Sequence, residues 1–132
     1  MVQNYRDLLV WQKAMLLAEA VFRQSESFPS TQRYVMVSQL QRCALSIPSN
    51  IAEGRSRHSE KDFIYHLNIA RGSLAELETV LLLSRNLNII DEISSDKLLK
   101  QANEVTKMLF GLRDSIASAV TSNLKPVTYA ES

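Results

Sequence analysis

The chain has 132 residues, of which 45% are hydrophobic and 22% charged, the length and composition of one globular domain. Three Gly, three Pro and one Cys are too few for a turn-rich β-sandwich, a collagen, a disulfide framework or a cysteine-rich zinc module. The chain has fifteen basic and fourteen acidic residues, a net charge of +1, so any binding of nucleic acid must depend on local clusters of charge. The N-terminus has no signal-peptide pattern and no apolar run can span a bilayer, so we expect a cytoplasmic protein with no membrane partner.

The first predicted helix covers about residues 7–24. Two apolar stripes run along it at spacings of three and four, which is typical of an amphipathic helix. The first stripe forms one helix face, which we take as the core face: Leu8, Trp11, Met15, Ala18 and Phe22. The second stripe is an additional apolar face: Leu9, Leu16, Leu17 and Val21. Phe28-Pro29 then ends the pattern, because a residue before proline avoids helical geometry.

The second predicted helix begins near Ser30 or Thr31 and ends near Gly54. Its expected core residues keep the same spacing: Tyr34, Val37, Leu40, Ala44, Ile47 and Ile51. Pro48 has no N–H for the Ala44 carbonyl, so the helix is expected to bend or restart there. Cys43 is expected to be a small buried apolar residue, because no His is placed to activate it.

The third predicted helix begins after a Ser59–Asp62 capping box and ends near residues 87–88. Its core residues are Phe63, Leu67, Ala70, Leu74, Leu77 and Leu81. The fourth is expected to begin at Ser94, with a hydrophobic staple between Ile93 and Leu98. Its core residues are Leu98, Ala102, Val105, Leu109, Leu112, Ile116 and Ala119. Lys125-Pro126 is expected to end it, which leaves one domain over residues 1–124 and a flexible tail over 125–132.

No segment has the period-two alternation of a strand, and the connections between helices are short. These features predict an all-α fold, an antiparallel up-down four-helix bundle. The first and third helices have more apolar surface than one bundle needs, so we expect self-association.

Three stretches of the sequence have a distinctive pattern: DLLVWQKA at residues 7–14, SQLQRCALSIPSNIAEG at 38–54 and ARGSLAELET at 70–79. They resemble a family of bacterial four-helix-bundle proteins encoded by intervening sequences within 23S ribosomal RNA genes. The resemblance extends from about Tyr5 to Ser118.

The resemblance implies an up-down bundle assembled as a ring of five subunits. A related branch, the accessory variability proteins of diversity-generating retroelements, forms barrel-shaped pentamers with a basic channel that bind nucleic acid and a reverse transcriptase. Within the matching motifs the resemblance implies structural or interface roles for Arg42, Ser46, Pro48, Asn50, Glu53, Gly54, Arg71 and Glu76.

The sequence contains no phosphate-binding glycine loop, nucleophile elbow or His-Glu-x-x-His motif, so we expect no enzyme activity and no cofactor. His58, Asp62 and His66 are spaced by four and could share a helix face, as metal ligands do. Because His58 precedes the helix and Asp62 belongs to its cap, we expect no metal site. Arg71 is expected to pair with Glu53 rather than with Glu76, which lies at a poor spacing on the same helix.

The only dense basic cluster lies in the turn between the second and third helices: Arg55, Arg57, His58 and Lys61. Repeated around a ring, this cluster would attract RNA or DNA through phosphate contacts without reading bases. The sequence therefore leaves two functions open. One is a nucleic-acid-binding accessory module, and the other is a structural ring or scaffold that binds other proteins.

Overall fold

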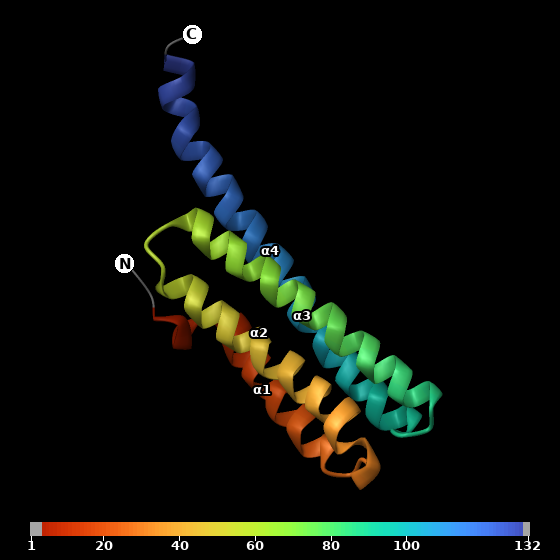
Figure 1. The fold of residues 1–132 in the computed structure, drawn as a ribbon. Coiled ribbons are helices and arrows are strands. Elements are labelled where there is room, and N and C mark those ends of the chain that lie inside the picture. Colours follow the sequence, from red (N-terminus) through yellow and green to blue (C-terminus); the bar gives the residue numbers. More distant parts are fainter. Residues whose placement is uncertain (1–3, 131–132) are drawn as a thin grey trace.

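The protein is all-α, as expected, in a computed structural model that describes the backbone of residues 4–130 and side chains up to residue 121. Four long helices follow one another along the chain (Figure 1): α1 (Leu9–Ser25), α2 (Ser38–Ser56), α3 (Glu60–Asn86) and α4 (Glu92–Ala130). Shorter helical turns cover Tyr5–Asp7, Ser30–Gln32 and Arg33–Val37, and residues 4–130 contain no strand.

Each short connection turns the chain back, so that helices next to one another in sequence lie side by side (Figure 1). Helices α1 and α3 each contact both α2 and α4, and the pair α2–α3 has the most extensive contact. A single core fills the space between them. It confirms the expected seam of α3 in full and most of the seam of α4, although Leu112 is only half-buried and Ala119 is exposed.

Helix α1 turns a different stripe to the core from the one expected. Its buried residues are Val10, Ala14, Leu17, Ala18, Val21 and Ser25. Trp11 and Met15 are only half-buried, and Phe22 is exposed. Trp11 packs at the edge of the core, with the Tyr5 ring edge-on at 5.3 Å between centroids. Of the first stripe only Ala18 is buried, whereas the second stripe supplies Leu17 and Val21 to the core.

We expect Trp11→Ala to lower the free energy of unfolding by about 1–2 kcal/mol, below the 3–5 kcal/mol typical of a fully buried Trp. Leu17→Ala, at a position with no exposed surface, is expected to cost about 2–5 kcal/mol. Urea denaturation of the two variants checks the order. If Trp11→Ala loses more free energy of unfolding than Leu17→Ala, Trp11 contributes more to the core than its half-buried position indicates.

Helix α2 begins irregularly and then runs through Pro48 without a break. The 3-10 turn Ser30–Gln32 is followed by a π-helical turn, Arg33–Val37, before regular α-helix starts at Ser38. Tyr34, expected in the core, lies in the π turn and is 88% exposed. Pro48 is buried inside the helix, so the chain does not restart there. The helix also continues past Gly54 to Ser56, so Gly54 is not its stop.

Local hydrogen bonds set the ends of α3. The Ser59 hydroxyl accepts from the Asp62 amide at 3.0 Å, which confirms the predicted cap. At the other end the Ile89 amide donates to the Ser84 carbonyl at 2.8 Å and the Asn88 amide to the Arg85 carbonyl at 3.0 Å. Asn88 has φ 61°, the left-handed geometry that closes a helix in this way.

Helix α4 starts earlier and ends later than expected. Asp91 caps it by accepting from the Ser94 amide and hydroxyl at 2.7 and 2.9 Å, and these bonds lower the pKa of its carboxyl. The helix therefore begins at Glu92 rather than Ser94. It continues through Pro126 to Ala130, which corrects the expectation that helix ends at Lys125; residues 131–132 of the expected tail lie outside the described part. Its C-terminal part extends beyond the other three helices (Figure 1).

Candidate nucleic-acid interface

The basic cluster expected from sequence lies where α2 ends and α3 begins. Arg55 belongs to the last turn of α2, Arg57 is the C-cap residue that follows it, His58 lies in the connection, and Lys61 belongs to the first turn of α3. Arg57, His58 and Lys61 are exposed, whereas Arg55 is half-buried, with its guanidinium 5.9 Å from the centre of the Phe63 ring.

Nearby carboxylates balance much of this charge. Arg57 forms a short ion pair with Glu53, one helical turn earlier on α2. Glu60 and Asp62 add two further negative charges at the start of α3. Among the described residues, neither His58 nor Lys61 has a carboxylate within 4.0 Å. The turn is therefore a site of mixed charge, in which His58, Lys61 and the half-buried Arg55 are the basic side chains that could contact a phosphate without first breaking an ion pair of the described residues.

Glu53 connects the turn to a buried histidine of α3. The Glu53 carboxylate lies 3.6 Å from His66 Nε2, while His66 Nδ1 lies 2.9 Å from the Asp62 carbonyl oxygen. The hydrogen bond from Arg57 holds the pKa of Glu53 below its usual value, and His66 lowers it further. His66 is 7% exposed, so the histidine that sequence placed beside His58 as a possible ligand points into the α2–α3 contact instead.

Gly54 is the closest point of that contact. A Cβ atom built on Gly54 would lie 2.7 Å from the His66 Cβ and 3.0 Å from the Phe63 ring. Real Cβ atoms do not approach that closely. Glycine is required here because the two backbones nearly touch, and this close approach is what brings Glu53 of α2 beside His66 of α3.

The motif around Pro48 forms a polar contact between α2 and α3. The Ser46 and Ser73 hydroxyls are 2.8 Å apart. The Asn50 side-chain amide donates to the Ser46 carbonyl at 2.9 Å and to its hydroxyl at 3.1 Å. Asn50 therefore bonds to the Ser46 carbonyl and not to that of Ala44, the group that Pro48 leaves without its usual N–H partner.

The expected pair of Arg71 with Glu53 was wrong. Arg71 of α3 reaches α4 instead, where its guanidinium lies 4.1 Å from the centre of the Phe110 ring. Arg113 lies over the same ring at 4.9 Å. A cation–π contact of this kind contributes about 0.5–1 kcal/mol, and of these two only that of Arg71 joins α3 to α4, because Arg113 and Phe110 both lie on α4. Arg71 is thus a packing residue of the bundle.

The two other charged motif residues, Arg42 and Glu76, are both exposed. Gln39 of α2 donates to the Glu76 carboxylate of α3 at 3.2 Å. Beside this bond Cys43 is 3% exposed, and burial raises the pKa of its thiol, with the Glu76 charge adding to the effect. Cys43 is thereby confirmed as a buried apolar residue.

A second basic surface was missed from the sequence. Lys97, Lys100 and Lys107 line a hollow of about 630 Å³ along the exposed side of α4. Their spacings of three and seven place them along one helix face and were the available signal. The row lies in the half of the bundle farther from the α2–α3 turn (Figure 1).

Within the described part of the chain, no group of three or more His, Cys, Asp or Glu residues is placed to hold a metal ion. Nor is any helix among those residues long and apolar enough to cross a membrane.

The comparisons with known proteins agree with this architecture. A sequence model of the 23S rRNA-intervening sequence proteins matches residues 6–111, so the chain belongs to that family. Among solved structures, it is similar to a protein of unknown function from the S23 ribosomal protein family of Bacteroides thetaiotaomicron, with 26% identity and a TM-score of 0.75. The match covers 80% of this chain and 98% of that one. A comparison with curated proteins found no match.

Proposed function

We propose that this protein is a non-enzymatic accessory module that assembles through α3 and binds nucleic acid through phosphate contacts. In this proposal the subunit is an antiparallel up-down bundle with α2 bent at Pro48, and copies form a homopentameric ring. The ring repeats the α2–α3 turn along one rim, where His58, Lys61 and the neighbouring arginines face a polyanion.

The observation that carries the proposal is a second apolar face on α3, opposite the core seam. This outer α3 face repeats at spacings of four and three from Tyr65 to the C-cap residue Leu87, and Glu76 is its one charged member: Tyr65, Ile69, Gly72, Glu76, Val80, Leu83 and Leu87. Tyr65, Leu83 and Leu87 are 62%, 46% and 55% exposed. A helix that is apolar on both sides is normally buried on both, which favours a second copy as the partner.

A hollow at the middle of the outer α3 face supports the same reading. Gly72, Ala75, Thr79 and Val80 line a depression of about 340 Å³ together with Glu76. A Cβ on Gly72 would meet nothing within 4 Å. Glycine inside a helix costs roughly 0.5–1 kcal/mol relative to alanine, and no contact within the subunit explains that cost. Close approach of another helix would explain it.

The mixed charge of the α2–α3 turn favours the alternative function, a scaffold that binds other proteins. Arg57 is already paired with Glu53, and the net charge of the chain is only +1. A ring that used its turns for protein contacts would need no excess of positive charge. Binding of RNA therefore decides between the two functions.

The test is an electrophoretic shift with structured ribosomal RNA at two salt concentrations, for the wild type and for an Arg55→Ala, Arg57→Ala, Lys61→Ala variant. We expect the slope of log affinity against log salt to become shallower by roughly 2–3 units per engaged subunit in the variant. Preference among RNA sequences should not change, because phosphate contacts do not read bases.

An unchanged salt slope would exclude the turn as the interface. The matched variant Lys97→Ala, Lys100→Ala, Lys107→Ala then asks whether the lysine row of α4 is used instead. If the wild type binds RNA no better than a neutral control protein, the scaffold function is the better one.

A further inference from the structure

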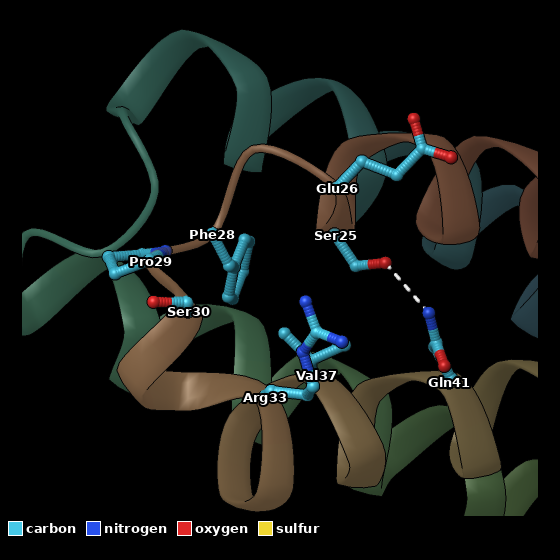
Figure 2. A pocket seen from close by; sticks show the side chains of 8 residues that line it. All are labelled: Ser25, Glu26, Phe28, Pro29, Ser30, Arg33, Val37 and Gln41. Carbon is cyan, nitrogen blue, oxygen red and sulfur yellow. Dashed lines mark hydrogen bonds between the residues drawn. The ribbon is translucent and has the colours of Figure 1, made fainter.

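A pocket of about 290 Å³ lies at the connection between α1 and α2, at the opposite end of the bundle from the α2–α3 turn (Figures 1 and 2). It has an apolar side and a polar side. The apolar side is formed by Phe28, Pro29 and Val37, and the polar side by Ser25, Arg33 and Gln41.

The polar side is held in place by a buried hydrogen-bond chain. Ser25 is 3% exposed and donates its hydroxyl to the Phe22 carbonyl at 2.7 Å. The same hydroxyl accepts from Gln41 Nε2 at 3.0 Å, the bond drawn in Figure 2. Gln41 therefore has a fixed position in the wall, and the second hydrogen of its amide remains for a ligand.

Arg33 supplies a positive charge to this pocket. Figure 2 shows its side chain rising from the start of the α2 segment into the space between Phe28 and Gln41. The carboxylate of Glu26, the other charged residue of the lining, points away from this space. Among the described residues, Arg33 has no carboxylate within 4.0 Å.

The backbone below the pocket is irregular at the same position. Arg33 is the first residue of the π-helical turn Arg33–Val37, which follows directly on a 3-10 turn. A π turn is wider than an α turn and is less favourable, and such turns occur frequently at functional sites. Here one π turn supplies both Arg33 and Val37 to the lining of the cavity.

We propose that this pocket binds a small carboxylate with a short apolar body. The planar guanidinium of Arg33 would take the carboxylate in two parallel hydrogen bonds, a geometry that suits arginine better than lysine. The free amide hydrogen of Gln41 would add a third bond, and Phe28, Pro29 and Val37 would contact the apolar part. The volume corresponds to the lower end of small-molecule sites.

The test is an NMR titration of the full chain with three probes. N-acetylalanine carries a carboxylate and a methyl group, N-acetylalaninamide is its neutral counterpart, and inorganic phosphate is an anion without an apolar body. We expect N-acetylalanine to shift the backbone and side-chain signals of Arg33, Val37 and Gln41 saturably, while the amide does not. Equal shifts with acid and amide, or tighter binding of phosphate, would overturn the carboxylate assignment.

Three variants locate the binding. Arg33→Gln should weaken the binding of N-acetylalanine by about tenfold or more. Arg33→Lys should weaken it by less, because lysine keeps the positive charge but cannot donate the two parallel hydrogen bonds of the guanidinium. Glu26→Gln should strengthen binding a few-fold, because it removes a nearby negative charge. The control is Arg23→Gln, which removes a positive charge paired with Glu19 at 3.7 Å outside the pocket. If Arg23→Gln weakens binding as much as Arg33→Gln does, the effect is general charge and the pocket is not the site.

Discussion

A Gly72→Leu variant is expected to be monomeric at micromolar concentration and yet more stable, as a single subunit, than the wild type. No atom lies within 4 Å of a Cβ at Gly72, so leucine fits the free subunit without strain. Leucine also favours helix over glycine by roughly 0.5–1 kcal/mol. In the assembly that we propose, the same side chain would fill the hollow of the outer α3 face and hold the neighbouring copy away.

Light scattering measures the molecular mass of each protein in solution. Urea denaturation measures the free energy of unfolding of the single subunit, and it is done at concentrations where both proteins are monomeric because assembly itself adds stability. The matched control is Gly111→Leu on α4, where a Cβ also meets nothing within 4 Å. It should gain the same helix stability and keep the wild-type mass. A Gly72→Leu protein that assembles normally would exclude the outer α3 face. If the double variant Leu9→Glu, Leu16→Glu is monomeric instead, the interface is the exposed face of α1.

Gly54→Ala is expected to lower the free energy of unfolding by about 2–3 kcal/mol, the upper range for overpacking, although alanine is the better helix former. The added methyl would lie 2.7 Å from the His66 Cβ and 3.3 Å from the Phe63 carbonyl oxygen, and neither is the end of a flexible side chain. The two helices would have to separate. That movement would also carry Glu53 away from His66, so the loss of stability should come with a change in the His66 NMR signals.

Gly111→Ala is again the control, because the same substitution there meets open space and should stabilise by up to about 1 kcal/mol. Thermal or urea denaturation of the two variants gives the comparison. Equal melting temperatures for Gly54→Ala and the wild type would mean that α2 and α3 can adjust without cost, and that Gly54 is not required by the contact.

The sequence predicted the core of α3 well because its core seam is apolar throughout from Phe63 to Leu81, whereas its outer face is interrupted by Glu76. In α1 two stripes were equally regular, and their spacing did not show which of them faces the neighbouring helices. Helices that approach closely select small residues such as Ala14, and the approach distance is a property of the partner helix. The apolar pattern of one helix therefore does not reveal how closely its neighbour will approach.

Helix ends were less predictable where proline was involved. Pro48 and Pro126 both lie inside helices, although each was expected to disturb one. A proline removes one backbone hydrogen bond and crowds the preceding turn, and a helix packed against its neighbours, as α2 is at the buried Pro48, can continue through it. The cap at Asp91 was missed for a simpler reason, since aspartate is as good an N-cap as serine and stands three residues before Ser94.

The candidate site was predicted as a segment but not as a set of contacts. Arg55 to Lys61 are neighbours in sequence, so their meeting at one turn required no knowledge of the fold. The Glu53–Arg57 pair also follows from a spacing of four and was overlooked. Arg71 is different: its side chain reaches Phe110 on another helix, and a contact across 39 positions has no local signal.

The unequal lengths of the helices have a mechanical consequence. Helix α4 has 39 residues and α3 has 27. At about 1.5 Å per residue, roughly 18 Å of α4 lies beyond the length of its neighbour, at the end of the bundle that carries the α2–α3 turn (Figure 1). The projecting part is a lever. If α4 tilts by about 10° about the point where it leaves the bundle, its far end moves by roughly 3 Å. A spectroscopic label at that end would therefore report a small tilt of the helix as a measurable displacement.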